Sequence, residues 1–283
     1  MPLFVKWEEV KDFLCIDKGH SQSRVALCSE MSRFNVIERW FSDKEWSRDN
    51  FRGLILHYIN LGRSQSTRNK LIRLGKHLDE LQNTKVVATF KTKKERLPKI
   101  NFVLSKEEMI QIAETKIFYK KYCDYINQRQ LVLIKLLATT GCRISEALNL
   151  QWENIKKERQ KFVEFLNTKN GEDRSVVINE DLFENILKLP RKSSFVFNSI
   201  RNEKLTSQQV NADIKKRAKK IGIEERVHCH LFRHSFTTNL LERGVSDSDV
   251  CKIAGWRDPK TLLRYKNSPL DYYAGVMAFA YRS

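Results

Sequence analysis

The sequence predicts a mainly α-helical protein of two domains, with one small antiparallel β-sheet in the second domain. Its 283 residues exceed one average domain of about 150 residues. Apolar residues recur at helical spacing through most of the chain, whereas one short stretch alternates around an Asn-Gly pair. A basic segment with a proline interrupts these patterns. We therefore expect an all-α domain at 1–90, a linker at 91–103 and a mixed α+β domain at 104–283.

The first domain is expected to consist of helices between about residues 10 and 87. Apolar stripes at helical spacing run through 33–41, 51–61 and 66–81. The stripe of the third segment consists of Leu71, Leu74, Leu78 and Leu81. Because each stripe gives its helix one apolar face, these helices are predicted to pack around a shared core.

Basic residues crowd the segment between the two domains. They face a single acid, Glu95, and Pro98 interrupts any helix there. Such a segment is typical of a domain linker and, taken alone, equally of a solvated charged loop. Its cations are candidates for contact with a polyanion: Lys91, Lys93, Lys94, Arg96 and Lys99.

The second domain is predicted to begin and end with helices. Ser105–Glu108 has the form of a capping box, in which the serine caps the helix and the glutamate reaches back. An apolar run over 131–138 predicts a helix that ends at Gly141, and a new helix is expected around Ile144. Thr206–Gln209 forms another possible capping box, after which the chain is helical again.

The sheet is predicted from a hairpin in the middle of this domain. Phe162–Leu166 alternates as a strand, and Ser175–Ile178 follows as its partner. Asn170 and Gly171 between them are the residues that a tight hairpin turn requires. Phe195–Phe197 is expected to add a third strand.

The charge of the chain indicates a polyanionic partner. A formal net charge of +18 and a pI near 9.7 exceed what solubility requires. Lysines and arginines that neutralise phosphates release condensed counterions, which favours nucleic-acid binding. A basic protein without a nucleic-acid role is the alternative. A second basic cluster lies on a predicted helix and is either a phosphate-binding or a merely solvated face: Lys215, Lys216, Arg217, Lys219 and Lys220.

Cysteine usage and the lack of targeting signals indicate a cytoplasmic protein. The six cysteines form no CxxC pair and are expected to be buried free thiols in a reducing compartment. They are Cys15, Cys28, Cys123, Cys142, Cys229 and Cys251. The N-terminus MPLFVKWEEV lacks the features of a signal peptide, and no run of about 18 apolar residues occurs, so no membrane contact is expected.

A histidine- and arginine-containing stretch is the first candidate site. On a helix, His230 shares a face with Arg233 and His234. Three interpretations compete. A zinc site would use His230 and His234 with His228 or Cys229, but the stretch lacks the glutamate of HExxH. A core or capping role is the ordinary alternative for His234. An anion site would use Arg233 to bind a phosphate and His230 to transfer a proton.

Three further positions are candidates with equally ordinary alternatives. Gly141 delivers Arg143 to the start of a helix, where Glu146 is placed to orient the guanidinium; the alternative is a surface Arg–Glu pair. Lys169 beside the hairpin turn is either functional or simply solvated. Asp258 and Pro259 are good first residues of a helix that would carry Tyr265 on a rigid element, although such a tyrosine is normally packing.

Taken together and in order, these positions resemble the active-site set of the tyrosine recombinases, or integrases. TGCRISEAL resembles the first arginine box of that family, HLFRHSFTTNLLERG its second box, and AGWRDPKTLLRY its third box and nucleophile helix. Trp256 stands where the third box usually has histidine, and Phe232 where leucine is usual. The resemblance covers the second domain and extends weakly to the first, through SQSTRNKLIRL, as a core DNA-binding domain.

The resemblance implies a role for each matched residue. Tyr265 attacks a DNA phosphodiester and forms a 3′-phosphotyrosyl link, while Arg143 and Arg233 bind the phosphate. Lys169 protonates the leaving 5′ oxygen, and His230 assists proton transfer from the tyrosine. Trp256 donates its indole N–H to the phosphate. No metal or other cofactor is implied.

The resemblance also implies partners and rivals. We expect double-stranded DNA and a homo-oligomer on it, a dimer at each site and a tetramer in the synapse. The protomers would be joined by a tail in which Leu270, Tyr273, Met277 and Tyr281 recur at helical spacing; the alternative is a terminal helix packed on its own core. In a prokaryotic host the protein would be nucleoid-associated. The lack of an extra N-terminal arm-binding domain favours a simple Xer-like or transposon-type enzyme. The rivals are a type IB topoisomerase and a non-catalytic DNA-binding protein of the same fold.

Overall fold

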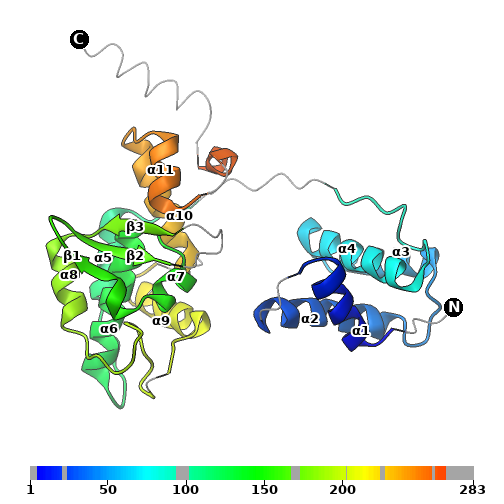
Figure 1. Cartoon of the computed structure of the whole chain (residues 1–283), viewed down its shortest axis with the longest axis horizontal. Coiled ribbons are helices and arrows are strands. Elements are labelled where there is room, and N and C mark those ends of the chain that lie inside the picture. The colour runs from blue at the N-terminus through cyan, green and yellow to red at the C-terminus, as the bar shows by residue number, and fades with distance from the viewer. Residues whose placement is uncertain are drawn as a thin grey trace, which may run out of the picture. The chain divides into compact units, whose positions relative to one another are not determined.

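A computed structural model of the chain divides it into two compact units, Met1–Leu97 and Pro98–Ser283. The structure describes residues 5–20, 24–93, 102–166, 173–201, 203–223, 227–256 and 259–265. These residues form helices and one small antiparallel sheet, which confirms the predicted fold class (Figure 1). Among them, no helix is long and apolar enough to cross a membrane.

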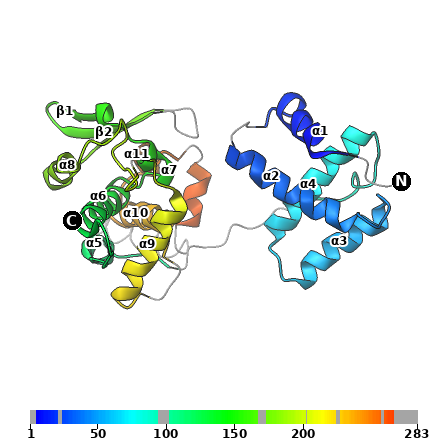
Figure 2. The same cartoon turned by 90° about the horizontal axis from the view of Figure 1, so that it is seen from below.

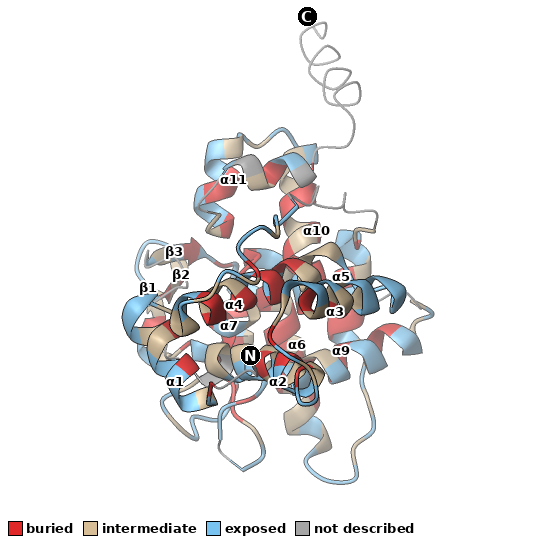
Figure 3. Cartoon of the chain, turned by 90° about the vertical axis from the view of Figure 1, so that its right-hand side faces the viewer, coloured by how far each residue is buried: buried red, intermediate tan, exposed pale blue. Residues whose placement is uncertain are grey.

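The first unit is a set of helices packed around one apolar core. Their bounds are α1 Trp7–Asp12, which continues as the π-helical turn η1 Phe13–Asp17, α2 Arg24–Trp40, α3 Arg48–Asn60 and α4 Gln65–Gln82. In α3 and α4 the buried positions follow one side of the helix (Figure 3). Phe51 and Leu74 are each 1% exposed or less, so the apolar stripes form the core as predicted.

Two buried polar side chains of α4 hold the chain that follows this helix. The Asn69 amide donates to the carbonyl oxygen of Lys93 at 2.7 Å and accepts from its N–H at 3.2 Å. The Asp79 carboxylate accepts backbone N–H groups of Val86 and Val87. These bonds position Lys93 at the end of the described part of the first unit, with its side chain exposed.

The second unit is built around α6. Its helices are α5 Lys106–Glu114, α6 Cys123–Thr140, α7 Ile144–Asn149, α8 Glu180–Leu187, α9 Ser207–Lys220, α10 Cys229–Glu242 and α11 Asp247–Ala254, with 3-10 turns η2 Trp152–Asn154 and η3 Pro259–Arg264. Figure 2 shows α6 and α10 side by side, with α5 and α9 next to them. The capping boxes predicted at Ser105–Glu108 and Thr206–Gln209 are confirmed.

The sheet has three strands in the order β1-β2-β3, each antiparallel to its neighbour. They are β1 Ile155–Lys157, β2 Lys161–Phe165 and β3 Arg174–Val177. Val163 of β2 pairs with Ile155 of β1 and Val176 of β3. The predicted hairpin is therefore confirmed, with its turn residues Asn170 and Gly171 outside the described residues.

The prediction that Phe195–Phe197 forms the third strand is wrong. Phe195 makes only an isolated bridge with Gln151, and the N–H of Val196 donates to the carbonyl oxygen of Leu150. This segment is apolar because Val196 and Phe197 fill the core of the unit. The actual third strand is β1, which the sequence did not predict.

The cysteines are all free thiols, but not all are buried. Cys142, Cys229 and Cys251 are buried, Cys15 and Cys123 are half-buried, and Cys28 is exposed. The prediction of burial is therefore confirmed for the first three and wrong for Cys28. Cys28 lies on α2, where the apolar face contains other positions of the helix. Burial raises the pKa of the Cys142 and Cys229 thiols to about 12, so both are protonated at neutral pH.

Candidate active site

The structure brings the two predicted phosphate-binding arginines to one acceptor. Arg143 precedes α7, and Arg233 lies in α10. The Nη2 atoms of Arg143 and Arg233 donate to the carbonyl oxygen of Gly255, at 3.0 Å and 3.2 Å respectively. The guanidiniums, which are far apart in the chain, therefore converge on one place beside the end of α11.

Local glycine geometry explains how the chain reaches this arrangement. Gly141 ends α6 with a φ of 60°, a left-handed conformation that glycine adopts without strain. A Cβ at this position would collide with the ring of Phe236. The Gly141 carbonyl oxygen accepts from Nη1 of Arg233 at 2.8 Å, so the turn that delivers Arg143 also holds Arg233.

Glu146 orients the Arg143 guanidinium and also binds a second arginine, Arg174. Its Oε1 accepts from Nη1 of Arg143 at 2.7 Å, and its Oε2 accepts from the Arg143 backbone N–H and from Nη2 of Arg174, both at 2.7 Å. Burial alone would raise the pKa of Glu146, but Arg174 and Arg143 outweigh it and hold the pKa below its ordinary value. Glu146 is therefore a carboxylate at neutral pH.

Arg233 is a buried cation with more positive than negative neighbours. It is 2% exposed, and its guanidinium carbon lies 4.2 Å from the centre of the Trp256 ring. Burial and the positive charge of Arg143 lower the pKa of Arg233 to about 10, which leaves it charged at neutral pH. Among the described residues, the guanidiniums of Arg143, Arg174 and Arg233 face one carboxylate, that of Glu146, so the cluster favours an added anion.

Tyr265 lies next to this cluster. Its hydroxyl is 2.5 Å from Nδ1 of His234, and its ring centre is 5.7 Å from that of Trp256. The side chain is 4% exposed and packs with Val250 and Leu262. Trp256 thus contacts both Tyr265 and Arg233, so the phenol and the guanidiniums belong to one connected site.

The element that carries Tyr265 differs from the predicted helix. It is the 3-10 turn η3, and Tyr265 follows it with its N–H bonded to the Leu262 carbonyl oxygen at 2.9 Å. The two leucines in this turn have different environments. Leu262 is fully buried, whereas Leu263 is 66% exposed. The predicted N-cap Asp258 lies outside the described residues.

The remaining predicted site residues have different outcomes. His230 is exposed on the first turn of α10, with its ring 6.4 Å from that of His228. The Trp256 indole N–H, expected to donate to phosphate, donates to Oγ1 of Thr237 at 3.3 Å. Lys169 lies outside the described residues. Within the described ranges, no group of three or more metal-ligating side chains occurs.

Two residues of this site were missed or misread from the sequence. Arg174 was not singled out, because its partner Glu146 lies 28 residues earlier in the chain. The spacing of the predicted hairpin places Arg174 on β3, but no local pattern shows which strand residue reaches α7. For His234 the sequence suggested only a core or capping role or a zinc ligand, whereas its half-buried ring is bonded to the Tyr265 hydroxyl.

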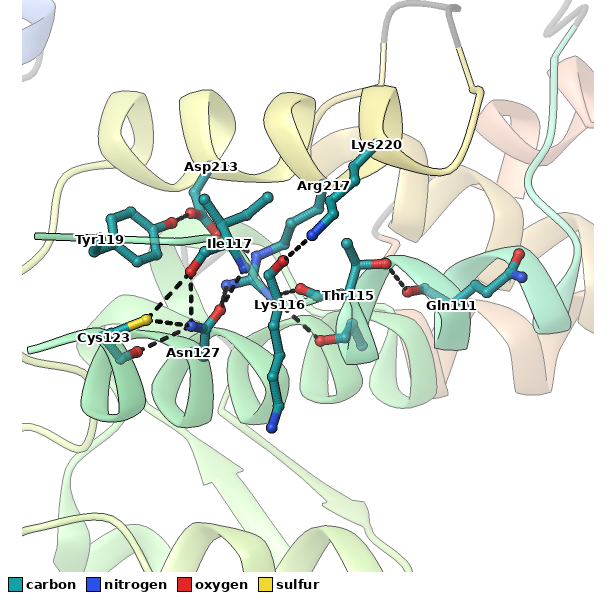
Figure 4. Close-up of polar contacts among 11 residues, drawn as sticks. Gln111, Thr115, Lys116, Ile117, Tyr119, Cys123, Asn127, Asp213, Arg217 and Lys220 are labelled. Atoms are coloured by element: carbon teal, nitrogen blue, oxygen red, sulfur yellow. Dashed lines mark hydrogen bonds and ion pairs between the residues drawn. The ribbon is translucent and has the colours of Figure 1, made fainter.

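The basic cluster on α9 is not a single solvent-facing surface. Arg217 is 1% exposed and pairs with Asp213 at 2.6 Å, and its guanidinium also donates to Asn127 at 2.9 Å (Figure 4). The expectation that Arg217 contacts DNA is therefore wrong, because it lies on the inward face of the helix. The other four members are exposed: Lys215, Lys216, Lys219 and Lys220.

The linker cations are described only in part. Lys91 and Lys93 are exposed. Lys94, Arg96 and Lys99 lie outside the described residues, as does the tail from residue 266 onward. The interactions expected for these positions therefore stay predictions.

Comparison with known proteins identifies the family. Residues 103–270 match the model of the phage integrase family, and the chain belongs to this family. A tyrosine recombinase XerA of Pyrococcus furiosus is 33% identical over 189 residues, which cover 64% of this chain and 59% of the relative. XerC of Rickettsia bellii is 25% identical and covers 95% of this chain and 93% of the relative. The chain spans about half the length of several other relatives; for XerA of Saccharolobus solfataricus, the match covers 46% of the relative.

Solved structures share the fold. XerH bound to its difH substrate has a TM-score of 0.72 at 18% identity, covering 96% of this chain and 85% of XerH. A lambda integrase tetramer bound to a Holliday junction has a TM-score of 0.70 at 16% identity, and the match covers 92% of this chain and 76% of the integrase chain. The family resemblance and the fold class inferred from the sequence are thus confirmed.

Proposed function

We propose that this protein is a site-specific recombinase that cleaves and rejoins DNA strands through a 3′-phosphotyrosyl intermediate. One observation carries the proposal: Arg143 and Arg233 converge on a single acceptor, and Trp256 connects them to the phenol of Tyr265. Membership of the phage integrase family supports the same reaction class.

In the proposed reaction, the Tyr265 oxygen bonds to the phosphorus as the bond from phosphorus to the 5′ oxygen breaks. Arg143 and Arg233 stabilise the charge on the non-bridging oxygens, and each donor of this kind contributes about 3 kcal/mol. A phosphate oxygen is a stronger acceptor for both guanidiniums than the neutral carbonyl of Gly255. Attack by the 5′ hydroxyl of another strand then reforms a phosphodiester and releases the tyrosine.

Protons move in both steps of this scheme. Lys169 protonates the leaving 5′ oxygen, and His230 assists the transfer of the phenolic proton. His234 holds the Tyr265 hydroxyl at 2.5 Å, which supports a role in orienting the nucleophile. Trp256 exchanges its bond with Thr237 for one to the phosphate. The arginines supply the positive charge in this scheme.

The proposed partner is double-stranded DNA, bound by a dimer at each site and by a tetramer in the synapse. The fold is shared with a lambda integrase dimer bound to a core site, a lambda integrase tetramer bound to a Holliday junction, and a Tn1549 integrase bound to transposon end DNA. We propose that the tail beyond residue 266 joins the protomers. The exposed side chains of Lys91 and Lys93 are proposed to contact phosphates.

A pool of nicked duplexes of randomised sequence tests the proposal. A nick next to the cleaved bond lets the 5′-hydroxyl fragment leave, which traps the covalent complex. We expect denaturation-resistant protein–DNA adducts with the natural protein and with a Tyr58→Phe control, but none with Tyr265→Phe. Adducts that persist in Tyr265→Phe would contradict the choice of nucleophile. Binding without adducts in any variant would favour the non-catalytic alternative.

The type IB topoisomerase alternative requires a separate assay. Both classes form the same covalent link, so adduct formation alone does not separate them. We expect trapped complexes to transfer their strand to a second duplex. Relaxation of supercoiled plasmid without such transfer would favour the topoisomerase.

A further inference from the structure

We propose that Arg174 is a positioning residue for DNA cleavage, which holds Glu146 and Gly255 so that the Arg143 and Arg233 guanidiniums are aimed at one phosphate. The proposal rests on the proposed function. Arg174 lies on β3, outside the three motifs that resemble the family boxes. Its side chain is 11% exposed, so it acts mainly through its protein neighbours.

The first neighbour is the Glu146 carboxylate. Its side chain is 3% exposed, and both oxygens are engaged, Oε1 by Arg143 and Oε2 by Arg174 and the Arg143 backbone. Because Arg174 fixes one oxygen of a planar group, it also fixes the direction in which the other oxygen accepts from Arg143. Without Arg174, the carboxylate keeps only the bonds to Arg143 among those described.

The second neighbour is the backbone of Gly255. A Cβ on Gly255 would lie 2.8 Å from Nη1 of Arg174, so the guanidinium lies directly against this residue. The Gly255 carbonyl oxygen is the acceptor shared by Arg143 and Arg233. Arg174 thus supports from one side the residue to which both phosphate-binding guanidiniums are bonded.

The third neighbour makes the support rigid. The Arg174 guanidinium carbon is 4.8 Å from the ring centre of Phe165, which is its antiparallel partner on β2. Phe165 is 2% exposed and belongs to the core of the unit. A flat guanidinium can stack on this ring and bond to Glu146 at the same time, whereas a lysine ammonium is a point charge without that shape.

These contacts predict which step depends on Arg174. A residue that aims other groups affects the rate of the bound complex more than the affinity for DNA. Misplacement of reacting groups by about 1 Å costs up to roughly 100-fold in rate. We therefore expect Arg174→Lys to lower the single-turnover cleavage rate at saturating protein by roughly 10- to 100-fold. The dissociation constant for the nicked duplex should change by less than about twofold, or about 0.4 kcal/mol.

Chemical rescue distinguishes positioning from a structural role. We expect guanidinium ion at millimolar concentration to restore part of the cleavage rate of Arg174→Ala. The matched control is Arg217→Ala, which also removes a buried arginine paired with a carboxylate of the same unit, but one whose partners are Asp213, Asn127 and Thr115 (Figure 4). Guanidinium should not accelerate cleavage by this control. Glu146→Gln combined with Arg174→Lys should be no slower than the slower single variant, because both act on one pair.

The outcomes separate this inference from the proposed function. A natural cleavage rate in Arg174→Lys would overturn the role of Arg174 alone. Parallel loss of rate, DNA affinity and thermal stability, without rescue by guanidinium, would also overturn it, because that pattern indicates a fold requirement. Failure of the natural protein to form any adduct would overturn the proposed function itself.

Discussion

The carbonyl oxygen of Gly255 is the atom on which the candidate site converges. It accepts from two guanidiniums, and Arg174 lies against the same residue. Gly255 has a φ of 67°, which glycine adopts freely and other residues adopt at a cost of about 1–2 kcal/mol. Gly255 is thus required both for the backbone turn at the end of α11 and for the close approach of Arg174.

Gly255→Ala tests the second requirement. The added Cβ would displace the Arg174 guanidinium, so we expect a loss of cleavage rate of roughly 10-fold or more through misaligned arginines. Gly244→Ala is the matched control, because Gly244 also has a positive φ, 77°, but an added Cβ there would meet no neighbouring atom within 4 Å. Thermal unfolding should show destabilisation of both variants by the positive φ, and a further loss in Gly255→Ala from the displaced Arg174. Equal cleavage rates in the two would contradict the account of Gly255.

At the scale of single residues, the sequence identified those with a recognisable motif and missed those defined by distant contacts. Arg143, Arg233, Trp256 and Tyr265 were predicted, and the structure brings them together. Arg174 acts on a residue 28 positions away, for which the sequence contains no local pattern.

Helices and strands could be predicted from the sequence where the residues that define them are close together in the chain. The capping box at Ser105–Glu108 lies within four consecutive residues, and the glycine end of α6 at Gly141 is equally local. β1 is only three residues long and too short to show alternation, so only its pairing with β2 reveals it. Leu262 of η3 packs against Val250 and Cys251 of α11, a tertiary contact that is likewise not visible in the residues of η3 alone.

In helix α9, the basic composition led to a wrong prediction for Arg217, although the spacing of the apolar residues indicates that Arg217 is buried. Val210, Ile214 and Ala218 mark the buried face, and Asp213 and Arg217 lie on the same side. The basic composition of the helix suggested a polyanion-binding surface that included Arg217. The helical period would have separated Arg217 from its exposed neighbours.

Arg217→Met tests the structural role of this arginine. It removes the partner of Asp213 and leaves a buried carboxylate, whose pKa burial already raises above its ordinary value. Breaking a buried ion pair in this way costs about 3–5 kcal/mol. We expect a clear fall in the denaturation midpoint, whereas the exposed neighbour in Lys216→Met should change stability by no more than about 0.5 kcal/mol. Equal stability of the two variants would contradict the role of the Arg217 network.

At the scale of the whole molecule, the net charge of +18 is the property from which binding to a polyanion was predicted. Each phosphate contact contributes a slope of about −0.9 to the dependence of log K on log salt concentration. We expect the combined Lys91→Gln and Lys93→Gln change to make this slope shallower by about two units. The control is the combined Lys11→Gln and Lys44→Gln change on the same unit, which removes the same amount of charge and should leave the slope nearly unaltered. The same shift in both variants would indicate a diffuse charge effect rather than specific contacts.

The central claim is that a phenol and two guanidiniums gather around one scissile phosphate. Mass spectrometry of the nuclease-digested adduct tests it most directly, because it identifies both the modified residue and the linkage. We predict a nucleotide joined through its 3′ phosphate to the peptide that contains Tyr265. A nucleotide on another tyrosine, such as Tyr272 or Tyr273, or a linkage through a 5′ phosphate, would contradict the account.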